Sequence, residues 1–336
     1  MSGNRKHIIL SSLLIAALSI TGCGTAEVTA PQTTVISESD YELFVFNSHV
    51  YSSFLEACYP EEYREAFFSL CDALNEGRDT FECKNKDAYD FCMDPVTLNQ
   101  LCPAAYGQIS GEFRDGTGYI TYETSAGEYL IRQQEFQKDI EDVLGRYIKS
   151  DYSDIDKCLV LYDYMATNYQ YGDPDINGQA NGGDCYACFK SKQGICVDLG
   201  TLYAYLLMQC GVDAIEVENS GMASSAGFHA WTYVSIGGKN YHIDVTAALK
   251  SGDATPGIAM DYFLVTDRDR DAAGYIYDEL EIPLIHMSAK DCSSYSFIAD
   301  DESYRLPEGS YCTGYDIAKG IIYYKDPDGE QEFRYA

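Results

Sequence analysis

The sequence Gly194-Ile195-Cys196-Val197-Asp198-Leu199-Gly200-Thr201-Leu202-Tyr203 opens the part of the chain that decides the fold. It continues as a mostly apolar run to Cys210, and Gly211 is suited to end a helix because glycine readily adopts the left-handed conformation there. We therefore predict a helix from Cys196 to Cys210. At its N-terminus the positive end of the helix dipole favours the thiolate of Cys196, and the thiolate is the nucleophile. The alternative is a buried cysteine that only packs as a small hydrophobic residue.

Two predicted strands, residues 228–236 and 239–246, follow this helix. Gly237-Gly238 between them is a strong signal for a two-residue hairpin turn. In that register His229 and Asp244 are diagonal neighbours on one face of the hairpin. The carboxylate can then orient the imidazole and stabilise its charged form. A loop with an odd number of residues would turn Asp244 to the other face.

These residues lie in three ordered motifs that resemble those of the transglutaminase-like superfamily. The motifs are the run from Gly194 with Leu206-Leu207 and Gly211, then His229-Ala230-Trp231, then His242-Ile243-Asp244-Val245-Thr246. Residues 156–164, 168–171 and 261–267 resemble segments that flank the motifs in the family. The resemblance covers residues 133–270, less than half of the chain. It implies an α+β fold with a papain-like core, in which a helix presents the cysteine against an antiparallel sheet.

The resemblance also implies a role for each motif. Cys196 would form a thioester with an amide carbonyl, His229 would carry the proton, and Asp244 would orient His229. The backbone N–H of Cys196 is the expected first oxyanion donor. The candidates for the second donor are Gln193 and Tyr186, and Trp231 is expected to form a wall of the site. No metal or cofactor is expected.

The triad predicts a thiol peptidase or amidase that acts on extracellular protein or cell-wall peptide. This hypothesis requires an accessible Cys196 close to His229. The first alternative is a non-catalytic module on the same fold that binds protein or glycan. The second is a transamidating protein crosslinker, because the triad does not determine whether water or an amine accepts the acyl group.

The first residues predict export and lipid anchoring. Arg5 and Lys6 precede a short apolar run to Ile20, which suits a signal peptide and is shorter than the about 20 apolar residues of a membrane span. The run closes on Leu18-Ser19-Ile20-Thr21-Gly22-Cys23, which resembles a lipobox. Lipidation of Cys23 would hold the folded part at the bacterial cell membrane, outside the cytoplasm. The alternative is an ordinary secretory signal.

The rest of the chain divides by composition. We predict a signal peptide at 1–22, a flexible tether at 23–40, a mainly helical N-terminal region of unclear role at 41–132, the transglutaminase-like domain at 133–270 and a small β-rich extension at 271–336. Within the N-terminal region, helices are expected on both sides of Tyr59-Pro60-Glu61, residues 78–108 are expected to be irregular, and residues 118–124 alternate like a strand.

The charge of the chain excludes one class of partner. The formal net charge is −30, and removal of a leader with two basic and no acidic residues would change it to −32. Such a surface repels nucleic acid, whose binding needs a basic patch. No nucleic-acid partner is therefore expected.

Several other residues have weaker signals. The 13 cysteines leave 11 after Cys23 and Cys196, an odd number whose pairing the sequence does not decide. Cys185 and Cys188 have redox-motif spacing but are expected in a loop, as a structural disulfide or two thiols. His242 shares the strand parity of Asp244 and could compete as a base, although a place at the margin of the site is favoured. The acidic runs 267–271 and 300–302 are expected to be solvated loops.

Overall fold

The computed structural model describes residues 41–176, 179–180, 182–223, 226–249 and 257–336. All of these residues lie in the second of two units of the chain, Pro31–Ala336. The predicted signal peptide, Cys23 and the tether up to residue 40 lie outside the described residues. Export and lipid anchoring therefore stay predictions.

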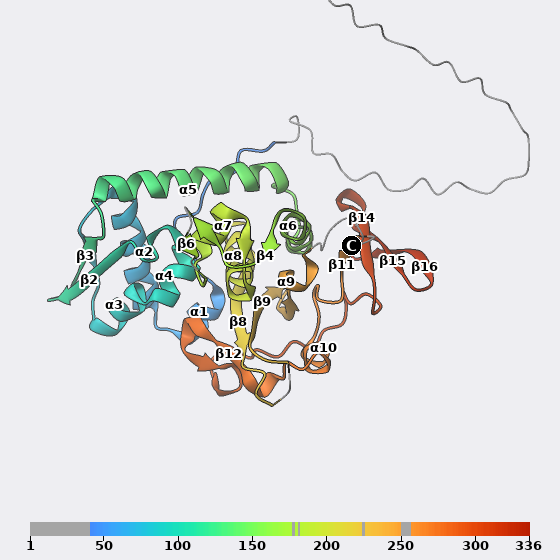
Figure 1. The fold of residues 1–336 in the computed structure, drawn as a ribbon. Coiled ribbons are helices and arrows are strands. Elements are labelled where there is room, and N and C mark those ends of the chain that lie inside the picture. Colours follow the sequence, from blue (N-terminus) through green and yellow to red (C-terminus); the bar gives the residue numbers. More distant parts are fainter. Residues whose placement is uncertain (1–40, 177–178, 181, 224–225, 250–256) are drawn as a thin grey trace, which may run out of the picture. The chain divides into compact units, whose positions relative to one another are not determined.

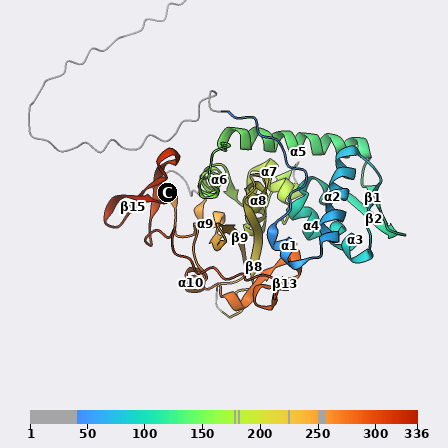
Figure 2. The ribbon, with the colours of Figure 1, turned by 180° about the vertical axis from the view of Figure 1, so that it is seen from behind.

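The described part of the second unit is a mixture of helices and antiparallel sheets, so the predicted α+β class is confirmed (Figures 1 and 2). The α-helices are α1 (Ser53–Cys58), α2 (Glu61–Glu76), α3 (Lys86–Met93), α4 (Pro95–Leu101), α5 (Ala126–Tyr147), α6 (Asp154–Asn168), α7 (Cys185–Ser191), α8 (Cys196–Gln209), α9 (Val245–Ala248) and α10 (Asp267–Ala272). The strands are β1 (Thr80–Glu82), β2 (Ile109–Arg114), β3 (Thr117–Tyr122), β4 (Gln170–Tyr171), β5 (Asp175–Ile176), β6 (Gln179–Ala180), β7 (Gln193–Gly194), β8 (Asp213–Asn219), β9 (His229–Ile236), β10 (Lys239–Ile243), β11 (Ile258–Ala259), β12 (Leu280–Ile282), β13 (Met287–Ser288), β14 (Tyr311–Asp316), β15 (Ile321–Asp326) and β16 (Gly329–Arg334). Short 3-10 helices lie at Pro103–Ala105, Tyr277–Glu279, Pro283–Ile285, Ala289–Asp291 and Ile317–Lys319.

Helix α8 lies against a five-stranded sheet of order β10-β9-β8-β12-β13, and it contacts β8 and β9 directly (Figure 1). The helix has the predicted bounds to within one residue, and Gly211 after it has φ +78°. Close approach to the sheet favours glycine at position 200, because a Cβ there would lie 3.1 Å from the Cα of Trp231. Thr232 of β9 donates a hydrogen bond of 2.8 Å to the carbonyl of Gly200. The contact thus fixes the first turns of α8 over the first half of β9.

The hairpin of β9 and β10 has the predicted register. Lys239 pairs with Ile236 and Ile243 pairs with Thr232, as a two-residue turn requires. Both turn glycines have positive φ, +59° and +77°, which a primed hairpin turn needs. The predicted extension of the second strand to residue 246 is wrong. The strand ends at Ile243 because the Asp244 side chain caps the short helix α9.

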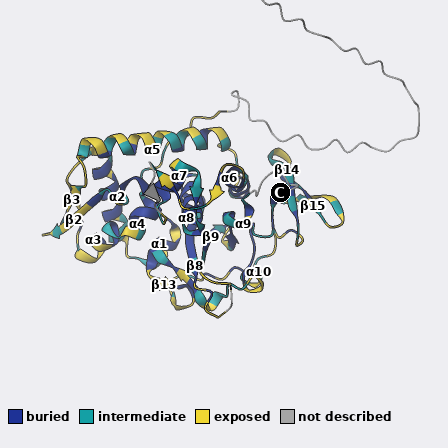
Figure 3. Cartoon of the chain, in the orientation of Figure 1, coloured by how far each residue is buried: buried dark blue, intermediate teal, exposed yellow. Residues whose placement is uncertain are grey.

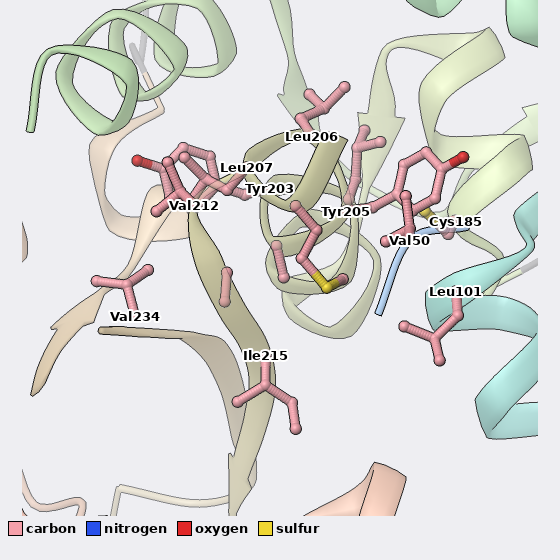
Figure 4. Packing of buried hydrophobic residues seen from close by; sticks show 14 of the residues in the cluster. Val50, Leu101, Cys185, Tyr203, Tyr205, Leu206, Leu207, Val212, Ile215 and Val234 are labelled. Atoms are coloured by element: carbon pink, nitrogen blue, oxygen red, sulfur yellow. The ribbon is translucent and has the colours of Figure 1, made fainter. Parts of the chain in front are cut away.

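Packing around α8 explains why the helix is apolar on all sides. Every residue of α8 except Val197 is buried, and Figure 3 shows the helix in the colour of buried residues. Figure 4 shows Tyr205 on the side of Val50 and Cys185, and Tyr203 on the side of Val212. Their buried hydroxyl groups are satisfied by hydrogen bonds. Tyr203 donates to the carbonyl of Cys158 (2.7 Å), and Tyr205 accepts from Gln209 (3.0 Å).

The N-terminal region contains more regular structure than predicted. Residues 78–108 were expected to be irregular but form β1, α3, α4 and a 3-10 turn. Asn85 caps α3 and Asp94 caps α4, with Pro95 in the first turn. Both are sequence signals for helix starts that outweigh the absence of a long periodic pattern. Strand β3 agrees with the predicted strand and is the middle strand of a sheet of order β1-β3-β2.

Helix α5 connects the N-terminal region with the rest of the unit. It contacts α2 and α6 (Figures 1 and 2). Ser125 and Glu128 form a capping box at its start. The helix runs through the predicted domain boundary between residues 132 and 133. Helix α6 begins after Ser153, whose side chain accepts from the backbone N–H of Asp156.

Two further segments differ from the prediction. The pair Cys185 and Cys188 lies in α7 and not in a loop, because Asp184 caps that helix by accepting from the N–H of Ala187. The acidic run 267–271 forms α10, capped by Thr266. It is not a solvated loop, since Arg270 is buried within it. In the run 300–302, Asp301 is half-buried and accepts a hydrogen bond of 2.6 Å from Tyr241.

The C-terminal segment forms a second antiparallel sheet, of order β11-β14-β15-β16. This agrees with the predicted β-rich extension, although α10 crosses the predicted boundary at 270 and β11 lies before it. The boundaries of the predicted domains stay predictions. Within the described residues, no helix combines the length and the apolar character that crossing a bilayer requires.

Two free cysteines that are far apart in the sequence, Cys58 and Cys292, lie close together in space. The Sγ atoms of Cys58, at the end of α1, and Cys292, directly after the 3-10 helix Ala289–Asp291, are 3.4 Å apart. Both residues are half-buried and line a pocket of about 100 Å³ that Tyr59 and Ile285 also border. Burial and the neighbouring thiol raise the pKa of Cys58 to about 12. The pair is close and accessible enough for thiol–disulfide exchange.

We predict that oxidised glutathione converts Cys58 and Cys292 to a disulfide, with release of two molecules of reduced glutathione. A bond between positions so far apart in sequence restricts the unfolded chain and should add about 2–4 kcal/mol to the stability. Non-reducing peptide mapping should find the 58–292 link, and the melting temperature should rise. In Cys58→Ser the rise should vanish, whereas Cys210→Ser should retain it. Free Cys58 and Cys292 after oxidation would contradict the prediction.

Candidate active site

Cys196 is the first residue of α8, as predicted. The short strand β7 leads into it and pairs in parallel with β4. Gly194 is required in β7 because a Cβ there would lie 2.7 Å from the Sγ of Cys188. Cys196 itself is only 7% exposed. The expectation of an accessible thiol is therefore met only weakly, and this bears on the proposed function.

Asp198 stabilises the start of α8 through hydrogen bonds to backbone N–H groups. Its carboxylate accepts from the backbone N–H groups of Ile195 (2.9 Å) and Asp184 (2.7 Å). These bonds tie the beginning of α7 to the beginning of α8. Burial raises the pKa of Asp198 to about 6, although the backbone hydrogen bonds oppose this shift. Asp198 is thus a structural acid next to the cysteine.

His229 and Asp244 meet as the hairpin register predicts. His229 Nε2 is 2.7 Å from Asp244 Oδ2, and the two side chains are 16% and 3% exposed. The imidazole also forms a hydrogen bond with Cys196. The structure therefore brings together all three residues of the predicted triad, from α8, from the start of β9 and from the residue after β10.

The electrostatics of this group favour a charged imidazole. Burial alone lowers the pKa of His229, but the hydrogen bonds to Asp244 and Cys196 and the charge of Asp244 raise it to about 9. Burial alone raises the pKa of Asp244, but the hydrogen bond with His229 and the charge of Arg270 lower it below its usual value. Both shifts describe an ion pair between the imidazolium and the carboxylate.

Asp244 has partners on every side. Its Oδ1 accepts from the backbone N–H groups of Thr246 (3.1 Å) and Ala247 (3.4 Å), which is the cap of α9. Its Oδ2 accepts from Arg270 Nη1 (3.2 Å) in addition to His229. The carboxylate is therefore fixed in orientation by α9, α10 and β9 together.

His242 lies behind Trp231 and is not available as a base. Its Nδ1 accepts from Trp231 Nε1 (2.9 Å), and its Nε2 is 2.8 Å from Asp267 Oδ1. Burial lowers the pKa of His242. Because Nδ1 is an acceptor, the ring is neutral and Nε2 donates to Asp267. The favoured place at the margin of the site agrees with this position.

The residues expected as a wall of the site and as the second oxyanion donor lie in three different surroundings. Trp231 is 1% exposed, and its ring centroid is 5.9 Å from that of His229, so it packs beside the triad. Gln193 precedes the cysteine in β7, but its Nε2 donates to the carbonyl of Asp173 (3.0 Å). Tyr186 points to α5, where the guanidinium of Arg132 lies 3.4 Å from its ring centroid. Its ring therefore serves the contact between α7 and α5.

Sequence reasoning missed three side chains near the triad. Arg270 contacts Asp244 as described, and the ring centroid of Tyr275 is 5.2 Å from that of His229. Tyr171 of β4 is 61% exposed and lies beside β7, and burial together with the charge of Cys196 raises its pKa. A single tyrosine among 30 carries no signal in the sequence. Among the described residues, no group of three or more His, Cys, Asp or Glu could hold a metal ion.

The α+β fold and the cysteine at a helix start facing a His–Asp pair define a papain-like arrangement. The profile of the Transglutaminase-like superfamily matches residues 142–245, which include all three residues. This part of the chain, about a third of its length, is therefore similar to the transglutaminase-like superfamily. No curated protein matches the chain significantly.

Two solved structures are similar to parts of the chain. One is a protein from Cytophaga hutchinsonii proposed to be a cysteine protease, at 20% identity and a TM-score of 0.27, covering 33% of this chain and 37% of the other. The other is a TGase, at 18% identity and a TM-score of 0.29, covering 44% and 46%. The chain thus spans less than half the length of either structure.

The raised pKa of His229 predicts a pH-dependent stability. The folded value of about 9 exceeds the usual 6.5 or so of an unfolded histidine, so the ion pair contributes fully below about pH 6.5. The contribution is lost as the pH rises through about 9. We expect the difference in melting temperature between the wild type and His229→Gln to shrink over this range. The exposed His286→Gln is the control, and a constant wild-type advantage up to pH 10 would contradict the prediction.

Proposed function

We propose that this protein is an exported, lipid-anchored thiol peptidase or amidase that acts on extracellular protein or cell-wall peptide. The observation that carries the proposal is the contact of His229 with both Asp244 and Cys196. A thiol beside an imidazolium that is held by a carboxylate has the arrangement of an activated nucleophile. The predicted signal peptide and Cys23 supply the proposed localisation.

The proposed reaction has two halves. The Cys196 thiolate attacks the amide carbonyl and forms a tetrahedral intermediate, and the protonated His229 gives its proton to the leaving amine as the C–N bond breaks. The thioester on Cys196 is then attacked by water, whose proton His229 takes as a base. The C–S bond then breaks, which releases the carboxylic acid product and restores the Cys196 thiolate beside the protonated His229. The backbone N–H of Cys196 lies in the first turn of α8, where N–H groups have no acceptor within the helix, and it is suited to stabilise the oxyanion.

The limited exposure of Cys196 favours a second candidate function. This candidate is a non-catalytic module that uses the fold only to bind protein or glycan. Such a module needs no contact between Cys196 and a substrate, which agrees with a thiol that is 7% exposed. The third possibility, transamidation, differs from hydrolysis only in the acceptor that attacks the thioester. An amine would then replace water in the second half of the reaction.

Alkylation of the full chain with iodoacetamide, followed by peptide mapping, tests the first candidate. We expect Cys196 to react faster than any other thiol below pH 7, and His229→Ala to lower its rate at least about tenfold, the order of an activating base. Asp244→Ala should lower the rate in the same direction, because it removes the group that orients the imidazole.

Cys210 is the internal control. It is more exposed than Cys196, but burial raises its pKa to about 12, so it should remain a slow thiol in every variant. If Cys196 reacts no faster than Cys210, the triad is not an activated nucleophile. The non-catalytic binding module would then replace the enzyme as the proposed function.

A further inference from the structure

Arg270 is a fully charged side chain inside the protein. It is 2% exposed, and its Nη1 donates to Asp244 Oδ2, the same oxygen that His229 contacts. Its Cζ lies 4.0 Å from the ring centroid of Trp231 and 4.8 Å from that of Tyr275. Among the described residues, its Nε and Nη2 have no hydrogen-bond partner. Its other close neighbours are therefore the rings of these two aromatic residues.

We propose that Arg270 is a positioning residue of the site, which compensates the charge of Asp244 so that the protonated His229 keeps its own charge available for the Cys196 thiolate. The inference rests on the proposed function, since it assigns a role within the same triad. It adds a fourth member that the three family motifs do not contain.

The charges around Asp244 support this role. The titratable groups that face it are His229 from β9, Arg270 from α10, Tyr162 from α6 and Tyr275 from the loop after α10. Burial raises the pKa of both tyrosines, so they are neutral near pH 7. The charge of Asp244 is therefore opposed by two cations.

The charge of the imidazolium is then left to be balanced by the thiolate of Cys196. With Asp244 and Arg270 neutralising each other, the group of four side chains has no net charge when Cys196 is a thiolate and His229 is protonated. Without Arg270, Asp244 alone would neutralise the imidazolium, and the thiolate would carry an uncompensated charge in a site of low exposure. Such a charge is costly away from water. Arg270 thus favours the thiolate through the triad and without contact to the substrate.

The same geometry explains why an arginine is needed. Its guanidinium is flat, so it can donate to Asp244 at its edge while its face lies on the Trp231 ring. Trp231 is in turn held by His242, which is held by Asp267 of the same helix α10. One short helix thus supports the triad at two points, three residues apart.

The matched pair Arg270→Met and Arg270→Lys tests the proposal on the full chain. His229 is followed by NMR of 13C-labelled histidine, with each of the five histidines assigned by substitution. The charge of Arg270 lowers the pKa of His229, so Arg270→Met should move the His229 titration to higher pH. The pH profile of Cys196 alkylation should also move to higher pH. A displacement of one unit would lower the rate at pH 6 about tenfold.

Arg270→Lys keeps the charge and should restore most of both profiles. Arg305→Met is the control, because Arg305 pairs with Asp269 of the same helix at 2.7 Å and is 40% exposed. It should leave both profiles in place. If Arg270→Met does not fold by circular dichroism, Arg270→Gln removes the charge while keeping a donor for Asp244, and the same two displacements are expected.

A folded Arg270→Met or Arg270→Gln protein with wild-type profiles would overturn the proposal. A role in folding alone would lower the melting temperature without moving either titration. Failure of the proposed function is a separate result: Cys196 of the wild type would then be a slow thiol. The His229 titration still reports on Arg270 in that case, because it does not depend on catalysis.

Discussion

The site depends on a negative charge inside the protein, the carboxylate of Asp244. An ionised carboxylate that is 3% exposed would cost several kcal/mol without partners. Here β9 provides His229, α10 provides Arg270, and the first turn of α9 provides two backbone N–H groups. Each of these elements therefore supplies a partner to this one group. The charge therefore organises the end of the hairpin and the segment after it.

A comparison of two buried carboxylates shows that the hydrogen-bond partners decide the direction of the pKa shift. Asp198 and Asp244 both accept backbone hydrogen bonds close to a helix start. Burial raises the pKa of Asp198 to about 6, because its partners are backbone dipoles. The pKa of Asp244 is lowered, because a guanidinium and an imidazole are added to the same kind of cap. Asp198 is therefore suited to fix the backbone at a helix start, and Asp244 is suited to pair with a charged histidine.

Local signals in the sequence were sufficient for the parts of the site that are adjacent in the chain. The apolar run with its final Gly211 predicted α8, and Gly237-Gly238 predicted the register that brings His229 to Asp244. The errors have local causes as well. The cap at Asp94 and the cap at Asp184 start short helices whose apolar pattern is too brief to recognise. The end of β10 was missed because nothing in the sequence distinguishes Asp244 as the cap of α9 from Asp244 as one more residue of the strand.

Arg270 was missed for a different reason. In the sequence it lies among acidic residues, where a solvated loop is the natural prediction, and its partner Asp244 lies 26 positions earlier. Nothing local distinguishes it from an exposed arginine such as Arg268, whose side chain is 66% exposed. Its burial follows from the way α10 packs against the hairpin.

The sequence by itself determined the helix that begins at Cys196 and the hairpin with its register, and therefore which three residues are the candidates for the triad. Helix periodicity, glycine turns and strand pairing act over a few residues, so they can be read along the chain. Only the tertiary structure decided the small exposure of Cys196, the neutral place of His242 behind Trp231 and the burial of Arg270 against Asp244. These depend on side chains that meet from distant segments, and the free energy of such contacts is set by what surrounds them after folding.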